Sequence, residues 1–379
     1  MESFLFISLM NSDPWGGSEE QWFTLAKYCC TINKKVTCLM YDWQDKRNKL
    51  QTLTDLGATI IYIPNKGRRK ENLLQRIRFE WITRLEQIQF IKKFDFSKYD
   101  YVLVNQGGFM EVTNHPWKNL YSRFGKYSLT FHNYDKNFVF KPAKAKLLVK
   151  WMHNAHLNIG DAFRIGGILE SQLQTKLDNW TSIVNPITIE RSKTYTIYPN
   201  LVDGKYKIVM LAQLDITRKA QDNLVMALAS DVWKSRNVIV ELYGGGSDFD
   251  LLQNLIQQYN LQKLVVLKGN TKVVAKALES AHIVLQITHR DAMPISVVEA
   301  MSKSRAVIVS DIGDMPLWVE DGINGWVSPD ASIASIHNVL EKAWQQKENW
   351  ELMGRNAFDT FTKKFPVSVE AFSYELITS

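Results

Sequence analysis

Cysteine is scarce in this chain, and long apolar runs are missing from it. Its 379 residues include three cysteines, Cys29, Cys30 and Cys38, which cannot all pair with one another and show no metal-ligand spacing to histidine. We therefore expect reduced, buried thiols in a cytoplasmic protein. No segment approaches the roughly 18 uncharged apolar residues of a membrane span. Residues 1–10 lack the basic start and the cleavage site of a signal peptide, and their apolar run predicts a buried strand.

Two signatures of other protein classes are also missing. The dinucleotide fingerprint Gly-x-Gly-x-x-Gly does not follow the first strand-like segment, which argues against a dehydrogenase. Aromatic residues do not interleave with basic ones in the strand-like segments, so we find no stacking platform for nucleic acid. The chain carries a net charge of +7, and such a basic excess favours a polyanion or an anionic membrane face as partner.

Strand-like runs alternate with helical patterns in both halves of the chain. The runs lie at residues 4–9, 35–40, 59–63, 101–104 and 126–131, and then at 207–211, 237–243, 264–267, 282–287, 306–310 and 326–328. This alternation predicts parallel sheets joined by helical crossovers, and the chain length predicts two domains. The pattern breaks over residues 179–205, which contain Pro186 and Pro199. The sequence therefore predicts an α/β protein with two Rossmann-like, doubly wound sheets, in domains at 1–185 and 186–359.

Ligands of doubly wound sheets bind beyond the carboxyl ends of the strands, so the loops there are candidate sites. Gly16 and Gly17 follow the first strand, where they allow close approach of an anion or simply make a tight turn. His132 ends another strand and is placed for a polar contact, although a single histidine is more often structural. Arg218 and Lys219 follow the first strand of the second domain, where they suit a diphosphate or form a solvated basic pair.

Two further loops of the second domain are unusual. Residues 244–246 are three consecutive glycines that either cradle a ligand or turn the chain. Asp248 and Asp250 resemble a divalent-metal pair, but Ser247 and Asp248 fit the capping of a helix better, so we expect no metal there.

The segment at residues 288–301 follows a buried strand and holds two acids. Pro294 suits the first turn of a helix, whose free backbone N–H groups at residues 293–296 would face an anion. Asp291 lies before this helix and Glu299 lies inside it. A carboxylate at an apolar helix start needs a partner, and the hydroxyls of a sugar or ribose would supply one. Two acids at this spacing occur often by chance, so the pair alone decides little.

Taken in order, these loops resemble glycosyltransferase family 4, a group of retaining enzymes with the GT-B fold, over nearly the whole chain. The matching segments are Gly16-Gly17-Ser18-Glu19, Asn185-Pro186, residues 213–222, residues 243–246, Asp291 to Glu299 on a Glu-x7-Glu signature, Asp311-Ile312-Gly313 and Asp321-Gly322-Ile323-Asn324-Gly325. The resemblance implies two Rossmann-like domains that face a cleft, with the acceptor bound by the first and the nucleotide sugar by the second. It also implies a last helix, at about residues 360–379, that crosses back onto the first domain.

The resemblance assigns a role to each matching residue. Glu299 would hold the ribose, Asp291 the hydroxyls of the donor sugar, and Lys219 the diphosphate, while His132 would touch the sugar from the first domain. Further donor contacts would come from Gly16, Gly17, Gln213, Arg218, Gly244, Gly245, Gly269, Asn270, Met293, Pro294, Ile295 and Ser296, with the base near Gly269 and Asn270. The chain departs from the family at Gln213, where the family has arginine, at the shorter acid Asp291, and at Ala292. Arg218 is the candidate to compensate for Gln213.

The implied function is transfer of a sugar from a nucleotide-sugar donor to a glycan or lipid-linked acceptor. The resemblance further implies retention of configuration, with no metal ion and no other cofactor. Lys219 and a helix N-terminus would stabilise the charge on the leaving diphosphate. A catalytically inactive binding protein, a sugar-nucleotide epimerase and a phosphorylase stay open as alternatives, although nothing here locates the lysine that a phosphorylase's pyridoxal cofactor needs.

Basic residues flank two apolar helical patterns in the predicted first domain. Lys66, Arg68, Arg69 and Lys70 precede one pattern, and Lys141, Lys144, Lys146 and Lys150 surround the other. Such segments often lie on anionic membranes, which predicts peripheral contact at the inner membrane face; a core-facing stripe with a solvated basic side is the alternative. Because the candidate residues are divided between the two domains, we also expect bound donor to close them.

Overall fold

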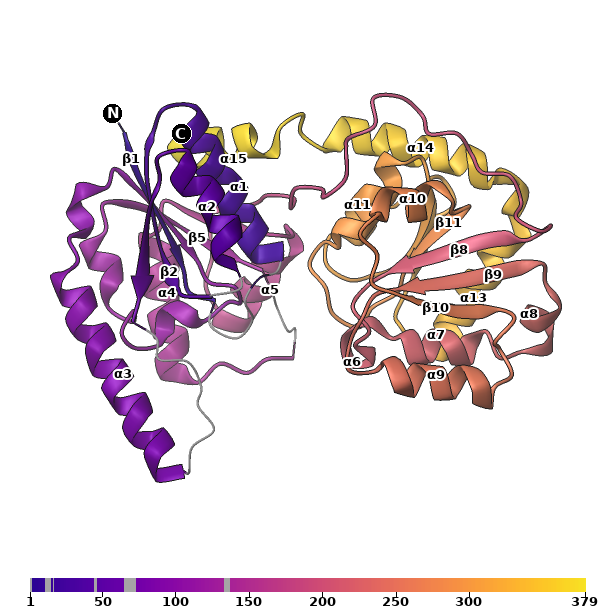
Figure 1. Cartoon of the computed structure of the whole chain (residues 1–379), viewed down its shortest axis with the longest axis horizontal. Helices are drawn as coiled ribbons and strands as arrows, with labels where there is room; N and C mark the ends of the chain where they lie inside the picture. The colour runs from indigo at the N-terminus through magenta and orange to yellow at the C-terminus, as the bar shows by residue number, and fades with distance from the viewer. Residues whose placement is uncertain (1, 11–14, 16, 44–45, 65–72, 133–136) are drawn as a thin grey trace. The chain divides into compact units, whose positions relative to one another are not determined.

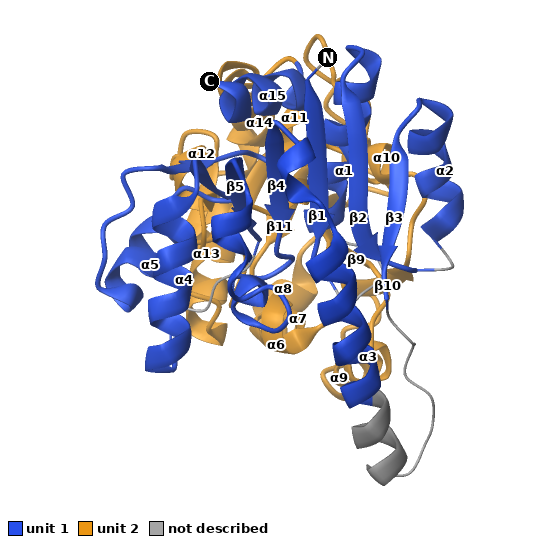
Figure 2. Cartoon of the chain, turned by 90° about the vertical axis from the view of Figure 1, so that its left-hand side faces the viewer, with its two compact units in different colours: residues 1–186, 368–379 blue, residues 187–367 orange. Residues whose placement is uncertain are grey.

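The chain forms two compact units. The computed structural model describes residues 2–10, 15, 17–43, 46–64, 73–132 and 137–379, with the side chains of residues 73–79 left aside. Unit 1 comprises Met1–Pro186 and Ser368–Ser379, and unit 2 comprises Ile187–Val367 (Figure 2). The sequence placed the domain boundaries between residues 185 and 186 and at about residue 360, whereas the chain divides after Pro186 and after Val367.

Unit 1 is built on a seven-stranded parallel sheet in the order β3-β2-β1-β4-β5-β6-β7. Its strands are β1 (Ser3–Ser8), β2 (Lys35–Tyr41), β3 (Thr59–Ile63), β4 (Tyr101–Asn105), β5 (Lys126–Phe131), β6 (Leu157–Gly160) and β7 (Trp180–Ser182). Every residue of the interior strand β1 is buried, as expected where helices cover both faces of a parallel sheet.

Helices connect these strands across both faces of the sheet (Figure 1). They are α1 (Gly17–Thr31), α2 (Arg47–Asp55), α3 (Leu73–Lys93), α4 (Pro142–Asn154) and α5 (Arg164–Leu173), with 3-10 turns η2 (Phe96–Lys98), η3 (Glu111–Thr113) and η4 (Leu120–Arg123). The strand order runs outward from β1 in both directions, so right-handed crossovers place α1 and α2 on one face and α3 and α4 on the other. In the described part of the chain, no helix combines the length and the apolar character that crossing a membrane requires.

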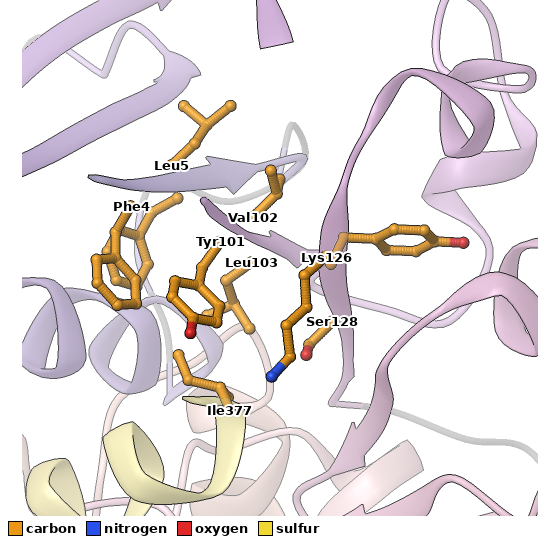
Figure 3. Close-up of a pocket in the computed structure, with 10 residues that line it drawn as sticks. Phe4, Leu5, Tyr101, Val102, Leu103, Lys126, Ser128 and Ile377 are labelled. Atoms are coloured by element: carbon orange, nitrogen blue, oxygen red, sulfur yellow. The ribbon is translucent and has the colours of Figure 1, made fainter. Parts of the chain in front are cut away.

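The last helix of the chain, α15 (Val369–Thr378), belongs to unit 1 and packs on α1. Its Tyr374 ring centroid lies 5.8 Å from that of Phe4 and 5.9 Å from that of Tyr28. A cavity of about 10 Å³ remains where Ile377 of α15 meets β1, β4 and β5 (Figure 3). A space of this size holds at most about one water molecule, so we regard it as a packing gap rather than a ligand site.

Unit 2 is built on a six-stranded parallel sheet in the order β10-β9-β8-β11-β12-β13. Its strands are β8 (Tyr206–Leu211), β9 (Val238–Tyr243), β10 (Val265–Gly269), β11 (Ile283–Gln286), β12 (Ala306–Ser310) and β13 (Gly325–Ser328). Its helices are α6 (Ile216–Lys219), α7 (Gln221–Ala227), α8 (Asp231–Ser235), α9 (Phe249–Gln258), α10 (Val274–Glu279), α11 (Ile295–Ser302), α12 (Met315–Trp318), α13 (Ile333–Gln345) and α14 (Trp350–Lys364), with the turn η5 (Lys347–Asn349). Figure 1 shows α10, α11 and α14 on one face of this sheet and α7, α9 and α13 on the other.

The prediction of two parallel α/β sheets is confirmed, and each predicted strand lies within two residues of an observed one. The apolar pattern of the sequence did not predict β6 or β7. The polar residue Asn158 interrupts the apolar pattern of β6. It can be buried there because its Nδ2 donates to the Met152 carbonyl at 2.9 Å. The short strand β7 lies inside the break predicted at 179–205, so only the later part of that stretch, after Pro186, leads into unit 2.

Candidate active site

The predicted ligand residues of unit 2 lie at one edge of its sheet. Because all six strands are parallel, their carboxyl ends share that edge. Gln213, Arg218 and Lys219 follow β8, Gly244 and Gly245 follow β9, Gly269 and Asn270 end and follow β10, and Asp291 to Ser296 follow β11. The contacts among these loops decide which of the residues meet.

Lys219 is the last residue of the short helix α6, and both ends of that helix are fixed. The Asp215 side chain caps the start by accepting from the Arg218 N–H at 3.2 Å. Ala220 ends the helix in the left-handed region, with φ 49°, which costs energy for a residue with a side chain and persists where its surroundings enforce it. The Thr288 hydroxyl donates to the Arg218 carbonyl at 2.6 Å and so joins α6 to the loop after β11. Lys219 is therefore held beside the loop that carries Asp291.

Lys219 and Asp291 form an ion pair, in which Lys219 Nζ donates to Asp291 Oδ2. The lysine side chain is 12% exposed and the aspartate side chain 19% exposed. The other carboxylate oxygen, Oδ1, accepts from the Ala292 N–H at 3.0 Å. Gly313 packs on the same loop, where a Cβ would lie 1.6 Å from the Ala292 carbonyl oxygen, so only glycine fits. The residues expected at the diphosphate and at the donor sugar thus contact each other.

Arg218 lies beside Gln213, the residue that stands where the family has arginine. Its Nη2 donates to Gln213 Oε1 at 3.2 Å, and its Nε donates to Asp215 Oδ2 at 2.9 Å. The Arg218 side chain is 39% exposed. This proximity favours the prediction that Arg218 compensates for Gln213.

The three consecutive glycines are explained by contacts within the chain. At Gly244, with φ 146°, a Cβ would lie 1.9 Å from the Ala212 carbonyl oxygen, and at Gly246 it would lie 2.1 Å from that of Leu214. A Cβ on Gly245 would approach the Asn270 amide nitrogen to 2.8 Å, which brings together two of the predicted donor residues. The loop therefore packs closely on the backbone after β8, and this packing requires glycine at 244 and 246 whether or not a ligand is bound, whereas at 245 only the end of the Asn270 side chain stands in the way.

Asp248 departs from the capping role expected of it. It holds the N-cap position of α9, but its side chain does not cap that helix. Instead its Oδ2 accepts from the Ile216 N–H at 2.9 Å. The reason is that Ile216 begins α6, and the first N–H groups of a helix have no partner within it. Asp248 therefore supports the helix that carries Lys219.

The helix α11 begins at Ile295, so Pro294 is its N-cap residue and not part of the first turn as predicted. Proline has no N–H, so Ile295 and Ser296 supply the free donors of the first turn. The Ser296 hydroxyl donates to Gln286 Oε1 at 3.2 Å. Gln286 is buried, and among the described residues its Nε2 has no hydrogen-bond partner. A buried amide donor therefore lies beside the start of α11.

Glu299 is buried inside α11 and is held by the segment that enters unit 2. Its Oε1 accepts from the Thr188 N–H at 2.7 Å and from the Thr188 hydroxyl at 2.6 Å. Burial raises the pKa of the Glu299 carboxyl, and the hydrogen bonds from Thr188 act against that rise. An ionised carboxylate can accept about four hydrogen bonds, so the Thr188 contacts leave capacity for further donors such as ribose hydroxyls.

His132 belongs to a buried polar network at the carboxyl edge of the unit 1 sheet. Its Nδ1 lies 2.7 Å from Asp161 Oδ1, and its Nε2 lies 2.5 Å from Asn105 Oδ1 and 3.0 Å from Thr130 Oγ1. The residue is 7% exposed. Both ring nitrogens are therefore engaged inside unit 1, where the resemblance had suggested a contact with the donor sugar.

The network continues from Asn105 to the first helix. Asn105 Nδ2 donates to Glu19 Oε1 at 2.8 Å, and Glu19 also accepts from Ser8 and from the Trp22 indole. Burial raises the pKa of the Glu19 carboxyl against these hydrogen bonds. Glu19 therefore anchors α1 to the ends of β1 and β4. Gly17 is the first residue of α1, whereas Gly16 lies outside the described residues.

The structure adds residues that the sequence analysis did not select. Asn105 and Gln286 are the last residues of the observed strands β4 and β11, and a polar residue at the end of an apolar run was the available signal. Asp161 follows β6, a strand that was not predicted. Thr188 carried no local signal, because its partner Glu299 is 111 residues away.

The chain is similar to several proteins that are named as glycosyltransferases. A family model described as glycosyl transferases group 1 matches residues 197–360, most of unit 2. Poly(ribitol-phosphate) alpha-N-acetylglucosaminyltransferase of Staphylococcus aureus is 26% identical over 250 residues, which cover 64% of this chain and 47% of that protein. Poly(glycerol-phosphate) alpha-glucosyltransferase of Bacillus subtilis is 25% identical over 199 residues, covering 52% of this chain and 29% of that protein. The matched regions thus span less than half the length of these relatives.

Solved structures extend the likeness to both units. HepE of Anabaena, in complex with UDP, superimposes with a TM-score of 0.75 at 15% identity, and the match covers 100% of each chain. At this identity the likeness concerns the fold, and it confirms a GT-B-type pair of parallel-sheet units. The narrower assignment to family 4 stays a prediction.

Proposed function

We propose that this protein is a hexosyl-type glycosyltransferase whose unit 2 binds a nucleotide-sugar donor. The observation that carries the proposal is the grouping of Lys219, Arg218, Asp291 and the start of α11 at one sheet edge. Cations and free helix N–H groups suit a diphosphate, and a carboxylate beside them suits sugar hydroxyls. The match of this unit to the glycosyl transferase model and the names of the relatives support the same conclusion.

The chemistry follows from the charge that develops on the departing diphosphate. In our proposal Lys219 and the N–H groups of Ile295 and Ser296 stabilise that charge, and they do so without a metal ion or another cofactor. We further propose that the anomeric configuration is retained. Arg218 adds positive charge at the place of the family arginine, because it lies next to Gln213. A uridine nucleotide is the donor to test first, since HepE was solved with UDP.

We propose that the acceptor is an anionic glycan or polyol-phosphate polymer, bound by unit 1. Both curated relatives carry such a polymer in their names. The helix α4 supports this choice, because it has no acidic residue and buries Leu148, Trp151 and Met152. Lys144 Nζ donates to Asn114 Oδ1 at 2.8 Å, and Lys146 and Lys150 have no carboxylate partner among the described residues. The exposed side of α4 is therefore cationic rather than apolar.

Contact with an anionic membrane, at its inner face in the cytoplasm, remains part of the proposal for lipid-linked acceptors. Its other support is α3, where Trp81 is 62% exposed and Leu85 is 50% exposed. The basic cluster Lys66, Arg68, Arg69 and Lys70, on which the hypothesis also drew, lies outside the described residues. Co-sedimentation with anionic and with neutral vesicles tests membrane contact. Equal pelleting of the protein with both kinds of vesicle would contradict it.

The decisive experiment incubates the protein with UDP-glucose or UDP-N-acetylglucosamine, with and without poly(ribitol phosphate) or poly(glycerol phosphate). We expect UDP release that depends on the polymer, sugar on the polymer, and an α-linked product by NMR. A chelator should leave the rate unchanged if no metal is used. Isomerised free nucleotide sugar without transfer would favour an epimerase, and donor binding without any turnover would favour an inactive binding protein.

A further inference from the structure

The ion pair between Lys219 and Asp291 joins the two residues that our proposed function assigns to different parts of the donor. Their side chains are mostly buried, and each neutralises the other in the free protein. Neither is loose: Asp291 Oδ1 is fixed by the Ala292 N–H, and α6 is tied to the same loop through the Arg218 carbonyl. Only Oδ2 of Asp291 is directed at the lysine.

We infer that Asp291 is a specificity-determining residue, which disfavours a bare nucleoside diphosphate relative to a nucleotide sugar. The inference rests on the proposed function and concerns the same site. A bound diphosphate draws the Lys219 ammonium to itself. The Asp291 carboxylate then loses its counter-ion while a second anion lies close by, and like charges in a partly buried site repel strongly.

A nucleotide sugar changes this balance through its hydroxyl groups. They donate to the carboxylate that Lys219 has left, so the polar group is satisfied again and its charge is spread over new hydrogen bonds. A nucleoside diphosphate has no sugar to supply these donors. Asp291 therefore shifts the affinity ratio towards the nucleotide sugar, and the Lys219–Asp291 pair re-forms as the product leaves.

The test replaces Asp291 with asparagine, which keeps the shape and the Oδ1 acceptor for the Ala292 N–H but removes the charge. Calorimetric titrations would compare UDP with UDP-glucose and UDP-N-acetylglucosamine. We expect Asp291→Asn to bind UDP about tenfold more tightly and the preferred UDP-sugar no more tightly than wild type does. The ratio of the two affinities should thus shift by a factor of about ten or more.

A matched control is available at the edge of the same sheet where the amino ends of its strands lie. Asp321 lies in the turn before β13 and forms an exposed ion pair with Lys342 at 2.5 Å. Asp321→Asn removes the same charge and frees a lysine in the same way, so general electrostatic effects on nucleotide binding would appear in both variants. We expect Asp321→Asn to leave the affinity ratio unchanged, and melting curves would verify that both variants are folded.

The outcomes separate this inference from the proposed function. Wild-type protein that binds neither UDP nor a UDP-sugar would overturn the proposed function, and the inference with it. Wild-type protein that binds both, with Asp291→Asn changing the two affinities by the same factor, would leave the proposed function intact and overturn the inference alone. An Asp321→Asn protein with the same shift in ratio would also overturn it.

Discussion

Unit 1 and unit 2 use the same kind of parallel sheet, yet they treat the polar residues at its carboxyl edge differently. In unit 1, Glu19, Asn105, His132 and Asp161 are between 1% and 7% exposed and hydrogen-bond to one another. In unit 2, the side chains of Lys219, Asp291 and Arg218 are between 12% and 39% exposed.

This difference suggests that the polar network of unit 1 stabilises the fold, whereas the polar contacts of unit 2 can be exchanged for contacts with a ligand. A buried network whose members are all hydrogen-bonded resists rearrangement, because breaking it leaves unpaired polar groups in a dry interior. The Lys219–Asp291 pair can exchange partners at lower cost, since a bound ligand supplies a new anion for the lysine and new donors for the carboxylate. We therefore expect substitutions in the unit 1 network to change stability, and substitutions at the unit 2 edge to change ligand binding and turnover.

The largest effect is expected at His132. Replacing it with alanine removes the 2.7 Å imidazole contact of Asp161, which among the described residues keeps only the Gln21 amide at 3.4 Å, and opens a cavity, so unit 1 should be destabilised by about 3 kcal/mol. Hydrogen exchange followed by peptide mass spectrometry would place the loss in unit 1. His153, whose Nε2 lies 2.9 Å from Thr175 Oγ1 at the exposed end of α4, is the matched control, and His153→Ala should cost far less. A stable His132→Ala protein with weakened donor binding would instead support contact with the sugar.

The next effect concerns Lys219. Lys219→Ala removes a cation from a charge that grows as the glycosidic bond breaks, so turnover should fall about a hundredfold while nucleotide affinity changes less. Steady-state rates beside calorimetric titration with UDP would separate the two quantities. Lys342→Ala provides the control, because it also removes a lysine from an ion pair with an aspartate, Asp321, but at the other edge of the sheet. Wild-type turnover in Lys219→Ala would remove the central residue of the proposed mechanism.

Glu299 is buried and hydrogen-bonded like the unit 1 residues, yet it is also a proposed ligand of the ribose. Its substitution therefore tests the comparison of the two units most directly. If its carboxylate holds the ribose, Glu299→Ala should weaken UDP binding about ten- to a hundredfold, as expected for charged hydrogen bonds. Thr188→Val removes one of the two hydrogen bonds from Thr188 and keeps the backbone donor. It should shift the melting temperature of unit 2 slightly and leave most of the affinity. Equal losses of stability in both variants, with UDP affinity intact, would make Glu299 a residue of the framework.

The sequence was sufficient for most strands of the two sheets because short apolar runs, here of three to seven residues, identify buried parallel strands. It was insufficient where a polar residue is buried inside a strand, as Asn158 is in β6. It placed Lys219 and Asp291 in loops at the carboxyl ends of strands of one parallel sheet, without predicting which of those strands are neighbours. It did not predict that they pair with each other, or that Thr188 holds Glu299, since such contacts depend on side-chain geometry across 72 and 111 residues of chain.

The smallest effect concerns acid stability, and it arises from a histidine that unit 2 buries without a carboxylate partner. His282 is fully buried, and its Nδ1 accepts from the Lys207 N–H at 2.9 Å. Burial, followed by the charges of Arg305 and Lys207, lowers the pKa of His282 to about 4. In the unfolded chain a histidine has a pKa of about 6.5. Between these values the unfolded chain binds the proton and the folded unit does not.

The contribution of His282 to stability is therefore fully present above about pH 6.5 and is lost as the pH falls towards 4. Near pH 5 the loss should be roughly 1–2 kcal/mol. His282→Asn keeps an acceptor for the Lys207 N–H but cannot titrate, so its stability should fall less between pH 7 and pH 5 than that of wild type. Calorimetric melting across this range, with hydrogen exchange in β8 and β11 to identify unit 2, measures the difference. Parallel pH profiles for the two proteins would mean that other groups govern the acid stability of unit 2.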